Sequence, residues 1–490
     1  MGPFSRLWVA SVALAGMAVL QCGSDEPLTG TKLEPPDISG GGCDASKTPD
    51  QGGCDVSDAA GIFVSTASGA DTNPGTKAAP FKTVQAGVNA AKKDALRRNI
   101  YVCEGTYDEQ LLLDEAAEGL ALHGGFACAD WAYKEMKVVL APSKAGYVVR
   151  VAGISGVIET FELRAKDGDV PGASSVAVFV EAAPGMTFRR AKIVAGNGAK
   201  GADGLANAPF ATAAQKGNAP TSSVAPGAEL TCTCPNGTTT GGAGGGGNKL
   251  PPPAIPPTPG KPVIAGAPAN AGQPYTSCGG GGAPGGYDGA GGLPADVVRG
   301  ATAIGTISSQ GWVPGAGSSG AVGGVAQGGA GAYGMFDAHV SSGGGCGGCG
   351  GKGGAPGGGG GASIGIVAIN STVRIQTSTV TTSDGGDGGK GGDGQSGQAG
   401  GIGGDELVGW SFCRGGTGGK GGDGSGGGGG AGGSSLGIVV LGADPRALLV
   451  DKETKFTIGA FKPGGPGGGP KGASGGYGID GFAASILGTK

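Results

Sequence analysis

The fold prediction rests on residues 61–107, which read GIFVSTASGADTNPGTKAAPFKTVQAGVNAAKKDALRRNIYVCEGTY. A short apolar run at 62–65 is followed by a turn-rich stretch at 69–76, where Asn-Pro and Pro-Gly interrupt regular structure. From 84 to 93 apolar residues recur at helical spacing, and Thr83 is a suitable N-cap. A second apolar run at 100–103 precedes Gly105-Thr106-Tyr107. The segment therefore predicts a strand, turns, a short helix and a second strand, in that order.

This order of elements resembles the N-terminal end of pectin-lyase-like parallel β-helices. The resemblance is carried by Gly-x-Asp-x-Asn-Pro-Gly-Thr at 69–76, Pro-Phe-Lys-Thr at 80–83 and Gly-Thr-Tyr at 105–107, and it covers about residues 61–125. In that family the helix covers the open end of the solenoid, which would otherwise expose apolar side chains and unpaired strand edges. The resemblance implies an all-β, right-handed parallel β-helix with an N-terminal capping helix. It implies little about chemistry, because these residues serve turns and capping.

Internal repeats extend the same prediction toward the C-terminus. Further short β runs occur at 111–113, 120–122, 138–140 and 147–151. Three later segments, 174–204, 362–388 and 434–465, each contain two or three short strands followed by a Gly-rich tract. Such a unit cannot bury its own apolar face and has to stack on a neighbour. We expect these segments to be successive coils of one solenoid, with the Gly-rich tracts leaving it on the same side.

The Gly-rich tracts have a period of their own. Glycine recurs at every third position between 385 and 403 and again between 415 and 433. Collagen is excluded, because neither tract contains proline and collagen-like chains need about 15–20%. Gly-Gly-X chains can instead form extended threefold helices of the polyglycine II type, which hydrogen-bond laterally. The side chains that fit an outward line are Asp387, Lys390, Asp393, Thr417, Lys420 and Asp423. Flexible linkers remain the alternative, because ordered glycine has a high entropic cost.

The N-terminus predicts export. Residues 7–20 are apolar, which is too short to span a bilayer but suits the core of a secretory signal. Cys22 follows, and the arrangement resembles a bacterial lipoprotein signal in which this cysteine is lipidated. Leu20 and Gln21 depart from the small residues of that pattern, so an ordinary signal peptide cleaved further upstream stays open. The expectation is an exported protein anchored by lipid at the outer membrane or cell surface.

The predicted organisation divides the chain into five parts. These are a lipoprotein-type signal peptide (1–22), a flexible tether (23–60), the N-terminal part of the β-helix (61–204), a Gly/Ala/Pro-rich low-complexity insert of mostly irregular structure (205–345), and the C-terminal coils with Gly-rich tracts (346–490).

Cysteine usage agrees with export. Of 11 cysteines, 10 remain if Cys22 is lipidated, an even number that allows disulfides. Closeness in sequence suggests three pairs: Cys43 with Cys54, Cys103 with Cys128, and Cys346 with Cys349. A zinc site at Cys232, Cys234, Cys346 and Cys349 is the alternative, but one residue between Cys232 and Cys234 is too tight for zinc spacing.

Few residues point to chemistry. The densest candidate group is Glu162, Arg164, Asp167 and Asp169, with Glu159 before it and Arg189 and Arg190 one repeat later. Clustered carboxylates could serve acid–base work or calcium binding on a carbohydrate-active enzyme. A solvated strand face looks the same, since Glu162 and Arg164 alternate with apolar residues. His123 is interpreted as a turn residue. No cofactor is expected, although calcium stays open as a bound ion.

The charge composition argues against a nucleic-acid-binding protein. A net charge of −4 with 15% charged residues offers no basic footprint for nucleic acid. The sequence therefore favours an exported structural or adhesive surface protein, with the membrane, surface polysaccharide or other surface proteins as partners. The alternative is a polysaccharide lyase or glycoside hydrolase that acts on acidic polysaccharide.

Overall fold

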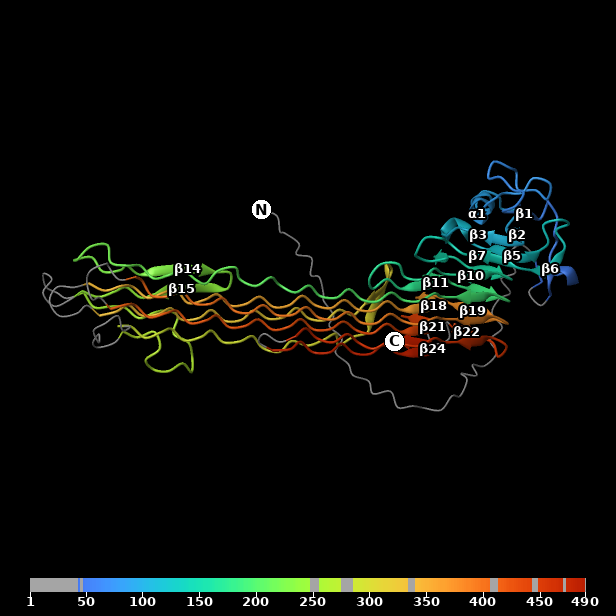
Figure 1. The fold of residues 1–490 in the computed structure, drawn as a ribbon. Helices are drawn as coiled ribbons and strands as arrows, with labels where there is room; N and C mark the ends of the chain where they lie inside the picture. The colour runs from blue at the N-terminus through green and yellow to red at the C-terminus, as the bar shows by residue number, and fades with distance from the viewer. Residues whose placement is uncertain are drawn as a thin grey trace, which may run out of the picture. The chain divides into compact units, whose positions relative to one another are not determined.

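The chain builds three parallel sheets and almost no helix. The computed structural model describes residues 43–44, 47–246, 255–274, 285–333, 340–405, 413–442, 448–469 and 473–489, all within one compact unit, residues 38–490. Most strands are short runs of three to seven residues, and each pairs in parallel with a strand from a neighbouring repeat. Figure 1 shows these strands stacked one above the other. The all-β prediction is confirmed.

We name the sheets A, B and C. Sheet A contains β1 (Gly61–Val64), β2 (Asn99–Cys103), β5 (Leu120–Phe126), β9 (Gly156–Glu159), β12 (Met186–Arg189), β19 (Val373–Gln376) and β22 (Leu448–Val450), with β6 (Tyr133–Met136) antiparallel to β5. Sheet B contains β3 (Gly105–Tyr107), β7 (Val138–Leu140), β10 (Glu162–Arg164), β13 (Lys192–Val194), β20 (Thr379–Thr381) and β23 (Lys455–Thr457). Sheet C contains β4 (Leu111–Leu113), β8 (Val149–Ala152), β11 (Ser175–Glu181), β18 (Ser363–Ile369), β21 (Ser435–Leu441) and β24 (Ala483–Thr489).

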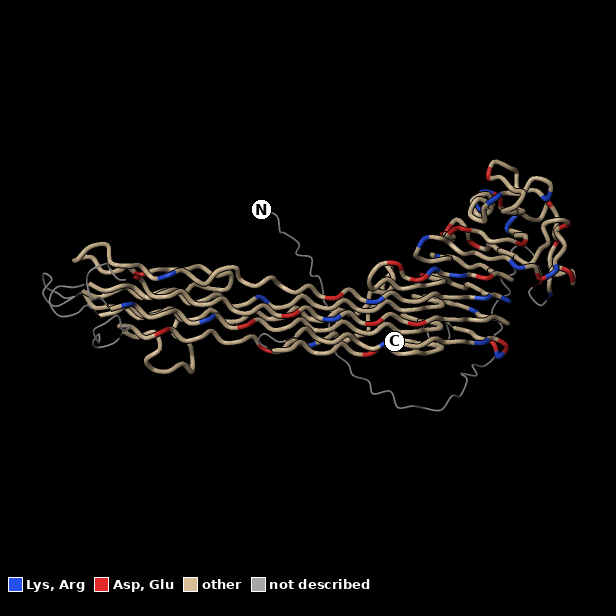
Figure 2. The backbone as a smooth tube through the Cα atoms, viewed as in Figure 1, with Lys and Arg blue, Asp and Glu red and all other residues tan. Residues whose placement is uncertain are grey.

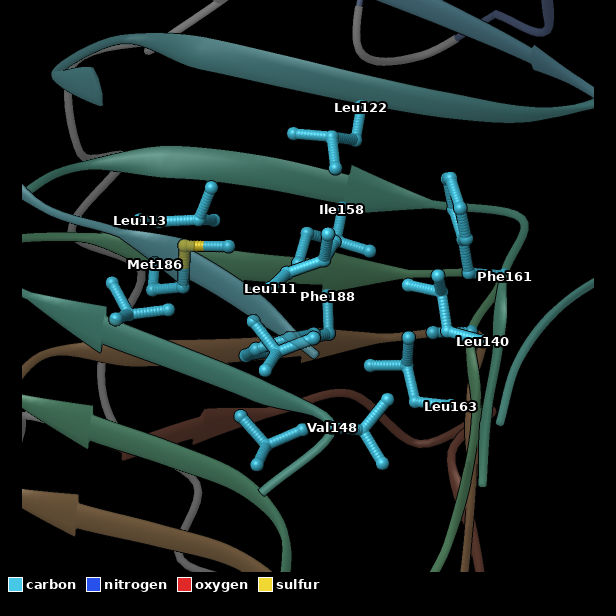
Figure 3. Packing of buried hydrophobic residues seen from close by; sticks show 14 of the residues in the cluster. Leu111, Leu113, Leu122, Leu140, Val148, Ile158, Phe161, Leu163, Met186 and Phe188 are labelled. Carbon is cyan, nitrogen blue, oxygen red and sulfur yellow. The ribbon is translucent and has the colours of Figure 1, made fainter. Parts of the chain in front are cut away.

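The chain visits the sheets in a fixed order. From β2 onward it passes through A, then B, then C, and returns to A one strand further along the stack. Alternate side chains of each strand point between the sheets, because successive residues of a strand face opposite sides. On sheet A the inward set includes Leu122, Ile158 and Phe188 in register, and all three are fully buried. Figure 3 shows them packed with Leu140 and Leu163 of sheet B.

One end of the stack is covered by α1 (Val84–Ala91). Its buried face, Val84, Val88 and Ala91, belongs to the same apolar cluster as Ile62 and Ile100. The Thr83 side chain accepts a hydrogen bond from the amide of Ala86 at 3.1 Å, as an N-cap does. The helix and its cap lie where the sequence predicted them.

The glycine-rich segments all leave the stack between sheet B and sheet C. They follow β13, β20 and β23 and lead into β18, β21 and β24, and residues 165–174 make a short version of the same excursion between β10 and β11. The first excursion also carries two hairpins, β14 (Leu230–Cys234) with β15 (Gly237–Gly241) and β16 (Gly305–Ser308) with β17 (Gly311–Pro314). Figure 1 shows the excursions running side by side. We call them the glycine-rich bundle, and each extended segment in it a row.

Two predicted regions contain ordered contacts that the sequence did not indicate. Within the expected tether, Cys43 is buried, and its Sγ lies 3.7 Å from Nε2 of His123. Within the expected irregular insert, residues 285–301 and 315–332 form rows whose amides bond to neighbouring rows. In both cases backbone and side-chain partners come from distant parts of the chain, which local composition does not indicate. The predicted signal peptide and Cys22 lie outside the described residues.

Candidate functional site

The predicted group around Glu162 lies on the outer face of sheet B. Glu162 and Arg164 flank Leu163 on β10, and Leu163 is fully buried in the core. The Glu162 carboxylate pairs with the guanidinium of Arg164, and it lies 3.2 Å from Nζ of Lys137 and 3.7 Å from Nζ of Lys192. Burial by itself raises the pKa of Glu162, but hydrogen bonds from Arg164 and Lys137 outweigh it and hold that pKa below its usual range. This carboxyl is therefore a stable anion and a poor general acid at neutral pH.

Asp167 and Asp169 are not brought into contact with Glu162. The Asp167 carboxylate accepts from the backbone amide of Asn197 at 2.7 Å, which ties two neighbouring excursions together. Asp169 pairs with Lys166 at 3.1 Å. The contacts of both carboxylates thus serve local structure.

Sheet A carries a buried polar network that the sequence only partly indicated. His123, Glu159 and Arg189 are adjacent in register on β5, β9 and β12. Arg189 donates twice to one Glu159 oxygen, at 2.5 and 3.0 Å, and Arg190 donates to the other. Nδ1 of His123 lies 3.6 Å from Glu159. Burial, followed by the two arginines, lowers the pKa of His123 to about 3. His123 is thus a neutral strand residue and not a turn residue, which corrects the sequence interpretation.

The first disulfide lies beside this network. Cys43 is bonded to Cys54, as their spacing suggested. These two sulfurs and His123 form the one group of three potential metal-ligand side chains among the described residues. Since the sulfurs are bonded to each other, they are not thiolates and do not offer a metal the charged ligands it prefers. The side-chain oxygen Oδ1 of Asn99 lies within hydrogen-bonding distance of His123, 3.2 Å from its Nε2.

The remaining disulfides correct one predicted pair. Cys103 is bonded to Cys128, as expected. Cys346 and Cys349, expected to pair with each other, are bonded instead to Cys232 and Cys234. The four cysteines considered for zinc do lie together, but as two disulfides that join the β14–β15 hairpin to the row at 346–361. The partners are 114 and 115 residues apart, so sequence proximity was the wrong guide.

The row at 413–433 is the centre of the glycine-rich bundle. Its backbone amides donate in three sets, each with a period of three residues, to three different neighbouring rows at 2.8–3.1 Å. Amides at 418, 421, 424, 427, 430 and 433 donate to 386–401, those at 416, 419, 422, 425, 428 and 431 donate to 315–330, and those at 426, 429 and 432 donate to 473–479.

Glycine is required at these contacts because the rows lie too close for a side chain. A Cβ added to Gly430 would lie 1.9 Å from the carbonyl oxygen of Gly358, and one added to Gly427 would lie 2.1 Å from that of Ala355. Real Cβ atoms essentially never approach closer than 3.0 Å. The sequence period of three is therefore the period of lateral backbone contact.

Side chains occupy the remaining positions, where a row faces outward. Lys390 pairs with Asp393 at 3.2 Å and Lys420 with Asp423 at 2.7 Å, one turn apart on their rows. Carboxylates also accept from the amides of the next row, as Asp203 does from Lys390 at 2.8 Å. Figure 2 shows the two charge signs spread along the rows. Each of these two lysines is thus neutralised by an aspartate on its own row.

Comparisons with known proteins add a short family match. Residues 67–113 match a family described as "Protein of unknown function (DUF1565)". No curated protein matches the chain. A crystal structure of the GH136 lacto-N-biosidase from Eubacterium ramulus is 14% identical over 27% of this chain and 26% of that chain, with a TM-score of 0.20. This chain thus aligns with about a quarter of that enzyme's length. In the part of the chain that is described, no helix has the length and apolarity needed to cross a membrane.

Proposed function

We propose that this protein is an exported structural or adhesive component of the cell surface, anchored by lipid at Cys22. In this proposal a right-handed parallel β-helix forms the base, and a polyglycine II bundle projects from it. The observation that carries the proposal is the lateral hydrogen bonding of residues 413–433 to three neighbouring rows.

The β-helix proposal is supported by the strand order. Three parallel sheets are visited in the same sequence turn after turn, and the inward residues of each sheet stack in register. The family matched at 67–113 is one associated with parallel β-helix proteins. Parallel strands joined by a crossover in one sheet are right-handed in nearly all cases, which supports the same hand here.

The polyglycine II proposal is supported by the three sets of backbone hydrogen bonds of the row at 413–433, each of which repeats every three residues and reaches a different neighbouring row. A threefold extended helix turns its amides outward at intervals of 120°, has no internal hydrogen bonds, and rises about 3.1 Å per residue. A central row then satisfies its polar backbone only if it has neighbours on several sides, as the row at 413–433 does. Ordering glycine costs about 0.5–1 kcal/mol per residue more than ordering alanine. The lateral bonds and close contacts offset this cost.

A structural role follows from what such a bundle can offer. Its interior is backbone, so it supplies stiffness and an ordered surface, and it supplies few groups for acid–base chemistry. The disulfides that join the β14–β15 hairpin to residues 346 and 349 hold one part of the bundle together covalently. Oxidised cysteines are typical of exported proteins.

The test combines location with activity. Intact cells that produce the full chain should be labelled by antibodies against it, and C22S should release the protein from the membrane fraction. The purified mature chain should produce no reducing ends or unsaturated products from acidic polysaccharides, with or without calcium. Absence of labelling on intact cells would contradict the surface role. Turnover would replace it with the lyase or hydrolase alternative.

A further inference from the structure

The outer face of sheet B carries basic and hydroxyl side chains in register. Glu162, Lys192, Thr379 and Lys455 are successive partners across β10, β13, β20 and β23. Leu163, Ile193 and Val380, the residues that follow the first three, are fully buried in the core. Because neighbouring residues of a strand face opposite sides, the column from Glu162 to Lys455 faces away from the core. A second outward column contains Arg164, Val194, Thr381 and Thr457.

The charges on this face do not balance. Lys137, Arg164 and Lys192 converge on the single carboxylate of Glu162. The cationic side chains are 66%, 49% and 55% exposed, whereas Glu162 is only 5% exposed. One buried anion therefore holds three cations whose outer sides remain in water, and Lys455 adds a fourth exposed cation two strands away.

This imbalance contrasts with the glycine-rich bundle of the same chain. There, Lys200, Lys390 and Lys420 each pair with an aspartate three residues later. The whole chain has a net charge of −4. An excess of positive charge on sheet B is therefore local, and it produces an attractive potential for anions at that face.

We infer that the outer face of sheet B binds an acidic polysaccharide, an inference that rests on the proposed surface function and names its partner. The site is a strand face and not a pocket, which suits an extended polymer. Lys192 and Lys455 are two strand spacings apart, roughly 9–10 Å, so cations recur along the stack. Threonine hydroxyls between and beside them can both donate to and accept from sugar hydroxyls.

A polysaccharide fits this face better than a nucleic acid does. Single-stranded nucleic acids bind on aromatic side chains that stack with the bases. The two outward columns of sheet B contain no aromatic residue from β10 to β23. Four cations are also fewer than the roughly 6–10 phosphate contacts of many DNA-binding proteins.

The experiment measures binding of the purified full chain to polygalacturonate, neutral dextran and single-stranded DNA. Polygalacturonate should bind, dextran should not, and the affinity should fall as salt rises from about 50 to 200 mM. K137Q/K192Q should weaken binding about 3–20-fold, on the scale of two exposed ion pairs. K390Q/K420Q is the matched control, because these lysines are similarly exposed, at 50% and 55%, but belong to balanced pairs. It should change affinity less than about twofold.

Glu162 gives a test of opposite sign. E162Q should strengthen binding, because it removes the only anion of the cluster and leaves three cations free. The inference is overturned if dextran binds as well as polygalacturonate, if the two double variants lose affinity equally, or if DNA binds more tightly than the polysaccharide. Surface labelling of intact cells is scored separately. Loss of binding with intact labelling would therefore refute this inference alone, and binding without labelling would refute only the surface role.

Discussion

Replacing a single interior glycine of the bundle should open it locally. Gly430 lies in the central row, donates to the carbonyl of Gly389 at 2.9 Å and accepts from the amide of Gly465 at 2.8 Å. The methyl group of G430A would lie 1.9 Å from the carbonyl oxygen of Gly358 and 2.3 Å from its carbon. Because the obstacle is backbone, no side-chain rotation relieves the clash.

The magnitude follows from this distance. Ordinary contact begins at 3.4 Å, so the two rows have to separate by about 1.5 Å at this point. A shift of that size breaks the two bonds that join these rows beside residue 430, from the amide of Gly357 to the carbonyl of Gly428 and from the amide of Gly360 to that of Ala431. Each has a net value of about 0.5–1.5 kcal/mol. Overpacking adds about 1–3 kcal/mol. We expect a local destabilisation of about 2–6 kcal/mol, concentrated in the rows that contain 358 and 430.

Gly291 provides the matched control in the same bundle. A Cβ at this position meets only the carbonyl oxygen of Lys420, at 3.5 Å, and its backbone does not have a positive φ. G291A should therefore be neutral, or stabilising by about 0.4–1 kcal/mol through the unfolded state. Its neighbour Gly292 has a carbonyl oxygen 2.2 Å from the added Cβ, so G292A should behave like G430A.

The assay is native-state hydrogen exchange read by mass spectrometry on peptides from the bundle and from the sheets. This readout is preferable to global unfolding here, because it locates a local destabilisation in particular rows. Exchange in rows 346–361 and 413–433 should accelerate in G430A and stay unchanged in G291A, while β9 and β12 stay protected in both. Equal exchange in G430A and G291A would show that the rows are not held by close lateral contact.

Two further predictions concern stability. Burial lowers the pKa of His123 to about 3 in the folded chain, against about 6.5 when unfolded, so stability should fall with decreasing pH from about 6.5 downward, by up to about 1.4 kcal/mol per unit. Denaturant midpoints between pH 6.5 and 5, above the range of ordinary carboxyls, should show this slope in the wild type and a flatter one in H123Q, and equal slopes would contradict a buried neutral histidine. Removing both long-range disulfides in C232S/C234S/C346S/C349S should cost about 2–5 kcal/mol and more than C43S/C54S, because either long-range bond alone keeps the same long loop closed, and sequence separations of 114–115 and 11 close loops of very different entropy. Thermal unfolding of the two variants tests this order, which equal losses would refute.

The sequence predicted helices, strands and outward-facing side chains correctly wherever a short repeat in the sequence determines which side of the chain is buried. The helix at 84–91 begins at its predicted cap, and the apolar runs at 111–113, 120–122 and 138–140 are strands. The outward line of Lys390, Asp393, Lys420 and Asp423 also lies on the surface, as the three-residue glycine period indicated. In each case a two-, three- or 3.6-residue repeat determines which side of the chain can be buried.

Local patterns failed where contacts join distant segments. Glu162 was a candidate acid, but Lys137 and Lys192 come from neighbouring repeats and make it a stable anion. A bond between Cys346 and Cys349 would close the shortest loop and so have the lowest entropic cost. Both cysteines lie on one extended row, however, and they are bonded to Cys232 and Cys234 of the β14–β15 hairpin.

By itself the sequence determined that this chain is β-rich, that a short helix precedes its repeats, and that its glycines have a period of three, because these properties depend on neighbours a few residues away. Only the tertiary structure decided that residues 285–301 and 315–332 belong to an ordered bundle. The reason is that an extended glycine row has no hydrogen bonds of its own, so its order depends entirely on which rows, far away in sequence, lie beside it.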